Sequence, residues 1–122
     1  MGYRIMAISR LHVGKRLSEV AIHNRTVYLA GQIAEDTQQD IVGQTREVLG
    51  HIDRLLAEAG SDKTLILSAQ IFISNMSHFP GMNEVWDSWV AAGHAPTRAT
   101  VEAKLANPAC LVEVVVVAAQ RD

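Results

Sequence analysis

The chain has 122 residues, of which 48% are hydrophobic and 5% aromatic, and its formal net charge at pH 7 is −2. This length suits one domain, here residues 1–122, with a largely aliphatic core. Lys and Arg form no cluster, and without one a protein cannot release the counterions that drive non-specific nucleic-acid binding. We therefore expect no nucleic-acid partner.

Three further absences narrow the setting of the protein. No stretch approaches the roughly 18 apolar residues of a membrane helix, and residues 1–10 hold no apolar run of signal-peptide length. Cys110 is the only cysteine, so no disulfide can form within the chain. We expect a cytoplasmic protein with no membrane partner.

The first third of the chain predicts three strands, at residues 3–8, 17–22 and 26–33. The last two form a hairpin around Asn24, because asparagine tolerates the positive φ that tight turns often require. Gly31 interrupts the third strand. A glycine at such a position indicates a bulge or the close approach of another group.

A long helix follows these strands. Thr37 and Asp40 resemble a capping box at its start, with Thr37 as the N-cap, and Gly60 ends it. Between them apolar residues recur at steps of four and three, which places them on one face of a helix of about six turns. That face comprises Ile41, Thr45, Val48, Ile52, Leu55 and Ala59.

The middle of the chain predicts another strand and a second helix. Residues 65–74 alternate between an apolar face and a mixed polar face, and a polar face on so central a strand needs solvent or a partner subunit. Ser77 can cap the second helix, whose first turn tolerates Pro80. The polar face comprises Ser68, Gln70, Phe72 and Ser74, and the helix carries a core stripe of Phe79, Met82, Trp86 and Trp89.

Two strands close the chain. The first carries Arg98, Thr100 and Glu102 on one face. The second, residues 111–117, is apolar apart from Glu113, as is typical of a central strand covered on both faces. A simple hairpin between the two strands would place Glu113 nearer Glu102 than Arg98.

The order of elements is thus β-β-β-α-β-α-β-β. Two helices packed on one face of a mixed sheet make an α+β sandwich. The other face of the sheet is left to be covered, and a small chain usually covers it by forming an oligomer.

No metal or cofactor site is indicated, since the five histidines and Cys110 lack metal-ligand spacing and no phosphate loop or esterase elbow is present. What remains is an arginine-centred site. The guanidinium of Arg98 can grip a carboxylate with two parallel hydrogen bonds, and Thr100 can add a donor. Two plainer interpretations stay open. Arg98 can be a solvent-facing strand residue, and Glu113 can be half of a structural ion pair or a subunit contact.

Several segments resemble the reactive-intermediate deaminase family, also called Rid or YjgF/YER057c/UK114. They run in order along nearly the whole chain, and the Pro-x-Arg strand with its downstream glutamate is the most specific of them. The segments are Tyr28-Leu-Ala-Gly31-Gln-Ile, the helix end Ala-Glu-Ala-Gly60, Phe79-x-x-Met82-Asn83-x-x-Trp86, Pro96-Thr-Arg98 and Val112-Glu113-Val114.

The resemblance implies a chorismate-mutase-like α+β fold and a homotrimer with three clefts between subunits. It implies hydrolysis of reactive 2-imino and 2-enamino acids to 2-keto acids and ammonia, with no metal or cofactor. On this resemblance Arg98 binds the substrate carboxylate, and Glu113 from the opposite subunit positions or activates the attacking water. Gly31 and Asn83 match cleft positions, and Thr100 stands beside Arg98 on the same strand.

The chain departs from the family pattern at several positions. Leu17 stands where many active members have tyrosine, Ala30 where serine often precedes the glycine, and Thr100 where cysteine is common. The Leu-Pro pair typical of the last turn is split into Leu105 and Pro108. These changes indicate a divergent subfamily that retains the carboxylate-binding arginine, Arg98.

Two rival functions stand beside imine deamination. A non-catalytic trimer on the same scaffold would bind a small carboxylate through Arg98 and turn nothing over. A ribonuclease, an activity attributed to some members of the family, is disfavoured because the sequence shows no histidine pair and no basic groove.

Overall fold

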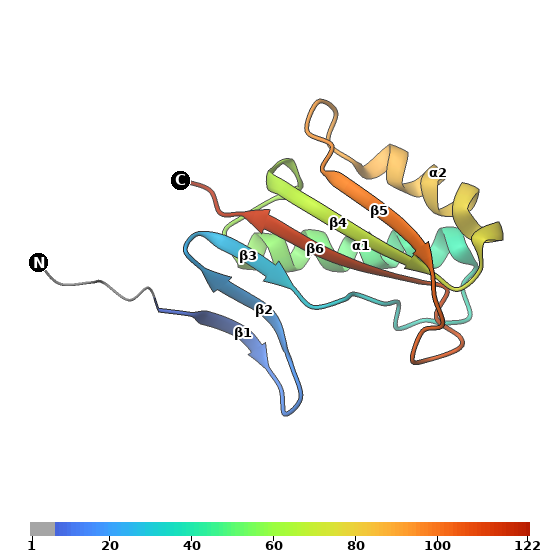
Figure 1. Ribbon diagram of the computed structural model, residues 1–122, viewed down its shortest axis with the longest axis horizontal. Coiled ribbons are helices and arrows are strands. Elements are labelled where there is room, and N and C mark those ends of the chain that lie inside the picture. The colour runs from blue at the N-terminus through green and yellow to red at the C-terminus, as the bar shows by residue number, and fades with distance from the viewer. Residues whose placement is uncertain (1–6) are drawn as a thin grey trace, which may run out of the picture.

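The computed structural model describes residues 7–122. Six strands form one mixed sheet in the order β1-β2-β3-β6-β4-β5, and two α-helices pack on one of its faces (Figure 1). The order of elements along the chain is the predicted β-β-β-α-β-α-β-β. The strands are β1 (Ser9–Val13), β2 (Ser18–His23), β3 (Thr26–Leu29), β4 (Ile66–Ile73), β5 (Thr97–Glu102) and β6 (Val112–Ala119). The helices are α1 (Ile41–Glu58) and α2 (Phe79–Trp89), with short 3₁₀ turns η1 (Lys63–Leu65) and η2 (Met76–His78) before β4 and α2.

The hairpin between β2 and β3 is confirmed. Asn24 and Arg25 form its turn with positive φ angles of 51° and 63°, which match the right-handed twist of the strands they join. The third strand ends earlier than predicted, at Leu29. Beyond Gly31 only Gln32 rejoins the sheet, through an isolated bridge to β6.

The first predicted strand, residues 3–8, lies mostly outside the described residues. Its last two residues are in no strand, so this part of the prediction is wrong. The first described strand is β1, because antiparallel pairing with β2 begins with Ser9 opposite Ile22.

Helix α1 begins after Asp40, so the prediction of Thr37 as its N-cap is wrong. The Asp40 carboxylate accepts a hydrogen bond from the backbone N–H of Gly43 at 2.9 Å, which satisfies one of the free donors of the first turn. The helix has 18 residues, or about five turns. Its predicted end is confirmed, since Gly60 follows it with φ +76°.

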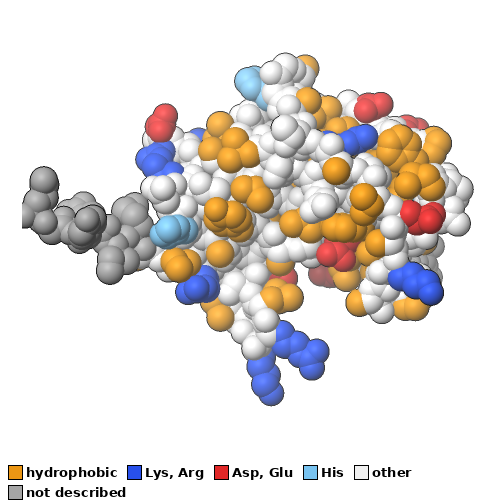
Figure 2. Space-filling model, viewed as in Figure 1, with side chains coloured by type: hydrophobic (Ala, Val, Ile, Leu, Met, Phe, Trp, Pro, Cys, Tyr) orange, Lys and Arg blue, Asp and Glu red, His pale blue; other side chains and the backbone are white. Residues whose placement is uncertain are grey.

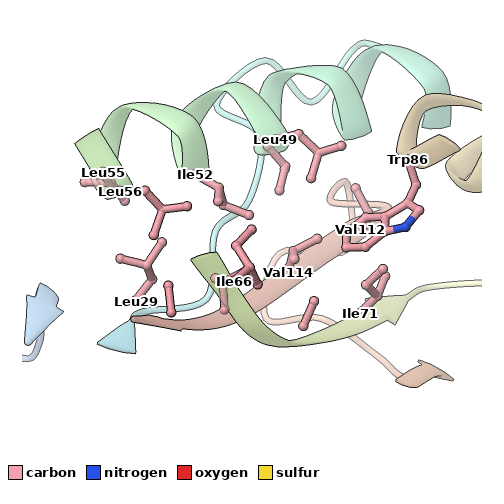
Figure 3. Packing of buried hydrophobic residues seen from close by; sticks show 14 of the residues in the cluster. Leu29, Leu49, Ile52, Leu55, Leu56, Ile66, Ile71, Trp86, Val112 and Val114 are labelled. Atoms are coloured by element: carbon pink, nitrogen blue, oxygen red, sulfur yellow. The ribbon is translucent and has the colours of Figure 1, made fainter. Parts of the chain in front are cut away.

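The core lies between α1 and the sheet (Figure 3). Val48, Ile52 and Leu55 of the predicted helix face are buried there, together with Leu49 and Leu56. They pack against the inward side chains of β4 and β6. Burying each large aliphatic side chain contributes about 1.5–3 kcal/mol, so this layer stabilises the packing of α1 on the sheet.

Strand β4 is irregular at its start. Ala69, Ile71 and Ile73 face the helices as predicted, but the next buried residue is Ile66 rather than Leu67. The pairing with β6 shifts register between Ile66 and Ser68, which moves Leu67 to an exposed position. The strict alternation predicted over residues 65–74 is therefore wrong for its first residues.

Helix α2 is preceded by η2, and this changes its cap. The side chain of Asn75 accepts a hydrogen bond from the N–H of Ser77 at 2.8 Å and caps η2. The N-cap position of α2 is His78, which makes no side-chain cap bond, so the prediction of Ser77 as the cap is wrong. Pro80 lies in the first turn of α2, as predicted. Met82 and Trp86 are buried, which confirms that the aromatic stripe belongs to the core.

Strand β5 lies beside β4 and runs parallel to it, with α2 as the crossover that parallel neighbours require. Strand β6 pairs with the other side of β4 in the antiparallel sense. The last two strands do not form the simple hairpin considered above, because β4 separates them.

The face of the sheet away from the helices is open, and Figures 1 and 2 view the molecule from this side. Its side chains include Gln70 and Phe72 of the predicted polar face. Tyr28 is 48% exposed and Val101 is 40% exposed on it, and Figure 2 shows hydrophobic side chains spread across the strands. Among the described residues no helix is long and apolar enough to cross a membrane.

Candidate functional site at the edges of the sheet

Arg98 lies on the edge strand β5, level with the buried Ala69 of β4, and its side chain therefore lies on the helix-covered face. Its Nη1 donates a hydrogen bond to Oδ1 of Asn83 on α2 at 2.8 Å. Its Cζ lies 5.2 Å from the ring centroid of Trp86 and 5.9 Å from that of Phe79. Two residues predicted for the site, Arg98 and Asn83, are thus in direct contact.

Thr100 and Glu102 follow Arg98 on the same face of β5. The hydroxyl of Thr100 is buried and has no hydrogen-bond partner among residues 7–122. The carboxylate of Glu102 accepts a hydrogen bond from the N–H of Met76 at 2.8 Å, which ties the end of β5 to η2. Glu102 is thereby a structural contact between strand and helix.

Glu113 points the other way. It lies opposite Phe72 in the pairing of β6 with β4, on the open face of the sheet. Its carboxyl group rests against Gly31, where an added Cβ would lie 2.8 Å from the carboxyl carbon of Glu113. The close approach predicted at Gly31 is that of Glu113, and only a glycine leaves room for it.

Arg98 and Glu113 do not meet within one subunit. Arg98 is level with Ala69, whereas Glu113 is level with Phe72, three residues further along β4. Three residues of strand correspond to about 10 Å, and β4 lies between the two side chains on opposite faces of the sheet. Neither side chain forms an ion pair with another of the described residues.

Two of the positions that depart from the family pattern, Leu17 and Ala30, lie on either side of the β2–β3 hairpin. Leu17 is 55% exposed just before β2, and Ala30 donates its N–H to the carbonyl of Glu19 at 2.9 Å.

Cys110 is 1% exposed, and burial, followed by the charge of Glu113, raises the pKa of its thiol. A buried thiol with a raised pKa is a packing residue rather than a nucleophile.

A hollow of about 350 Å³, lined in part by Gly31, lies between the β1–β2 hairpin and α1. In it Nε2 of His12 lies 2.5 Å from Glu58, and Nε2 of His51 lies 2.9 Å from Glu47. The sequence showed no histidine pair, because β1 and α1 are distant along the chain. The one available signal was the recurrence of Glu47, His51 and Glu58, with Arg54, on one face of α1.

The described residues contain no group of three or more His, Cys, Asp or Glu side chains placed to hold a metal ion.

Residues 7–120 match the family described as Endoribonuclease L-PSP. The chain belongs to this family. A RutC family protein of Haemophilus influenzae is 52% identical over 114 residues, which cover 93% of this chain and 98% of that protein. A member of the YjgF protein family from Neisseria meningitidis has a solved structure with a TM-score of 0.95 and 43% identity, covering 98% of this chain and 99% of that one.

A more distant relative carries the name of an enzyme. The 2-iminobutanoate/2-iminopropanoate deaminase of Capra hircus is 24% identical over 109 residues, which cover 84% of this chain and 79% of that protein. These similarities confirm the predicted resemblance to the YjgF group and its chorismate-mutase-like α+β fold.

Proposed function

We propose that this protein is a deaminase that hydrolyses reactive 2-imino and 2-enamino acids to 2-keto acids and ammonia. The reaction takes place in clefts between the subunits of a homotrimer. The observation that carries the proposal is that Arg98 and Glu113 lie on opposite faces of the sheet, and neither has an ion-pair partner among residues 7–122. Each is half of a site that a second copy of the chain completes. The name of the Capra hircus relative supports the same reaction.

Arg98 binds the carboxylate of the substrate. Its guanidinium lies at the edge of the sheet, is always charged, and offers parallel donors that fit the two oxygens of a carboxylate. Asn83 lies beside it on α2, and Thr100 lies two residues further along β5. This grip fixes where the imine carbon sits relative to the neighbouring subunit.

Glu113 acts on water. The substrate reacts as the protonated iminium ion. The Glu113 carboxylate takes a proton from water as the water oxygen bonds to the iminium carbon, and the C=N electron pair moves to nitrogen, which yields a carbon bearing one hydroxyl and one amino group. The proton then passes from Glu113 to the amino nitrogen, the C–N bond breaks, and ammonia leaves with the bonding electrons. The hydroxyl gives its proton to the Glu113 carboxylate as the C=O bond of the 2-keto acid forms, and this proton passes on to ammonia or water.

Substrate binding by Arg98 and proton transfer by Glu113 are sufficient for the reaction. Imines already hydrolyse in water, so orientation of the carboxylate and one general base need supply only the 10²- to 10⁴-fold assistance that such a group typically gives. No step draws on a metal or a cofactor.

Glu113→Gln tests the proposal, because the amide is nearly isosteric but cannot accept a proton at neutral pH. We expect roughly 10²-fold slower single-turnover hydrolysis of an enzymatically generated 2-imino acid, with the trimer and 2-keto acid binding retained. Unchanged hydrolysis by a stable Glu113→Gln trimer would exclude the catalytic role. A wild type that binds 2-keto acids but hydrolyses none of several 2-imino acids would instead be the non-catalytic binder.

Ribonuclease activity, which the family description names, is less well supported. The hollow beside α1 brings His12 and His51 together with Arg54, and paired histidines can serve as acid and base. Each histidine is bound by a glutamate, however, and Glu19 and Glu35 also line the hollow, so its carboxylates repel a phosphate backbone. RNA cleavage that survives Arg98→Ala and repeated purification, but is lost in His51→Ala, would favour the ribonuclease.

A further inference from the structure

We infer that Asn83 is a positioning residue for Arg98, and that it leaves the Nε–Nη2 edge of the guanidinium as the edge that receives the substrate carboxylate. The inference rests on the proposed function, because it concerns how the same site is held. It differs from the expectation that Asn83 contacts the substrate.

The guanidinium lies over one stripe of α2, which we call the α2 platform and which consists of Phe79, Asn83 and Trp86. These residues recur at steps of four and three, so they lie on one face of the helix. The two ring centroids lie 5.9 Å and 5.2 Å from Cζ of Arg98, within the range of cation–π attraction. That attraction holds the guanidinium near the rings but does not by itself fix its rotation.

Asn83 fixes the rotation, because a hydrogen bond is directional. The Nη1···Oδ1 distance is 2.8 Å, that of a well-formed bond to a charged donor. An arginine has five N–H donors, and a carboxylate binds in parallel either to Nε with Nη2 or to Nη1 with Nη2. Whichever hydrogen of Nη1 bonds Asn83, the Nε–Nη2 edge keeps both of its hydrogens. Neither Nε nor Nη2 has a partner among the described residues.

The α2 platform is anchored at both ends of the helix. The carboxylate of Glu102 accepts from the N–H of Met76 just before α2, at 2.8 Å. At the far end Nε1 of Trp89 donates to Asp53 of α1 at 2.9 Å. Arg98 is therefore oriented before a ligand arrives, and the entropy of ordering this long side chain is lost in folding rather than in binding.

The neutral amide of Asn83 suits this role better than a carboxylate would. Aspartate at the same position would accept the same hydrogen bond, but its negative charge would repel a second carboxylate on the guanidinium. Asn83→Asp should therefore keep the orientation of Arg98 and lose affinity for an anion, and added salt should reduce that loss by screening the repulsion.

A double-mutant cycle separates positioning from direct contact. Pyruvate is the probe, and its binding is titrated by NMR against wild type, Asn83→Ala, Arg98→Lys and the double variant. If Asn83 acts through the guanidinium fork, Asn83→Ala weakens binding roughly ten-fold in wild type and less than two-fold in the Arg98→Lys background, where a single ammonium replaces the fork. The same ten-fold loss in both backgrounds would mean a direct contact with the ligand and would overturn the inference. Glu84→Ala, an exposed change on the same helix, is the matched control and should change nothing.

A second measurement does not depend on ligand binding. In the ligand-free protein, the Nη groups of Arg98 should rotate slowly and give separate ¹⁵N–¹H signals in wild type and in Asn83→Asp, but averaged signals in Asn83→Ala. Averaged signals in wild type would overturn the inference. Slow rotation in a wild type that binds no pyruvate would uphold the positioning of Arg98 by Asn83 and count against the proposed function instead.

Discussion

The carboxyl group of Glu113 contacts Gly31, and the absence of a side chain there determines the position that the carboxylate occupies. A Cβ on Gly31 would lie 2.8 Å from the carboxyl carbon of Glu113. The carboxylate is the flexible end of its side chain, so it would move away rather than force the backbone apart. Gly31 therefore determines the position of the Glu113 carboxylate more than it determines stability.

Gly31→Ala should impair hydrolysis strongly and change the free energy of unfolding by less than about 1 kcal/mol. The measurements are single-turnover hydrolysis of a 2-imino acid and urea unfolding. Gly50→Ala is the control, because nothing lies within 4 Å of a Cβ at that position of α1. It should raise stability by about 0.5–1 kcal/mol and leave hydrolysis unchanged. Full activity of Gly31→Ala would show that the place of the carboxylate is not critical.

Glu47 stabilises the loop before α1 in a pH-dependent way. The N–H of Glu35, followed by His51 and the N–H of Asp36, lowers the pKa of its carboxyl group below the ordinary value of 4.5. Because folding lowers this pKa, the contribution is complete above pH 4.5 and is lost as the pH falls through the folded value.

Glu47→Gln should therefore lower the free energy of unfolding at pH 7, and the difference from wild type should shrink as the pH is lowered below about 4.5. Urea unfolding of both proteins at several pH values measures it. Glu84→Gln, an exposed change on α2, is the control and should leave the free energy of unfolding unchanged. Asp53 on α1 is unsuitable as a control because its carboxylate accepts a hydrogen bond from Trp89. A difference that is the same at pH 3 and pH 7 would contradict this role of the carboxylate.

At the scale of elements, the start of α1 depends on one side chain. Asp40 accepts the N–H of Gly43, whereas Thr37 makes no side-chain hydrogen bond of this kind. Asp40→Ala should destabilise the protein by about 0.5–2 kcal/mol, and Thr37→Ala should cost clearly less. Thermal unfolding of the two variants beside wild type measures the difference. Equal losses would mean that the capping box predicted from the sequence is used in solution.

The crossover from β4 through α2 to β5 is the element that makes the arginine half of the site. It delivers Arg98 to the edge of the sheet directly over Asn83, so one helix both covers the core and orients the charged group. Strand β6 on the other side of β4 carries Glu113 to the open face. Arg98 and Glu113 thus belong to separate surfaces of the molecule, and in the proposed function a second subunit brings them together.

At the scale of the whole molecule, the open face of the sheet carries exposed apolar side chains that a subunit interface would cover. Tyr28 is 48% exposed on β3, opposite Val117 of β6, in a part of the sheet that has neighbours on both sides. If this face is the subunit interface, Tyr28→Lys should give monomers at micromolar concentration and abolish hydrolysis, while the monomer stays folded. Sedimentation equilibrium and circular dichroism measure this. Ala57→Lys, on the exposed side of α1, is the control and should remain trimeric. A trimeric Tyr28→Lys protein would place the interface elsewhere.

The sequence by itself determined most of the elements, because their signals are local. Steps of three and four residues place Val48, Ile52 and Leu55 on one helix face, and Asn24 and Gly60 adopt the positive φ angles that their positions required. The same local patterns singled out Arg98 and Glu113 as charges in strands. These features depend on neighbours within a turn or two of the chain, so no knowledge of the fold was needed.

Only the tertiary structure decided what these residues touch. The neighbour of β5 in the sheet depends on which of several distant segments pairs with it most favourably. That neighbour is β4 rather than β6, the next strand along the chain. The register shift before Ser68 and the contact of Glu113 with Gly31 follow from the same pairing. Strand pairing depends on burying the apolar face of the complete sheet, not on the sequence of one strand alone. A one-residue change of register moves every side chain of the strand to the other face. The opposite directions of Arg98 and Glu113 come from that pairing.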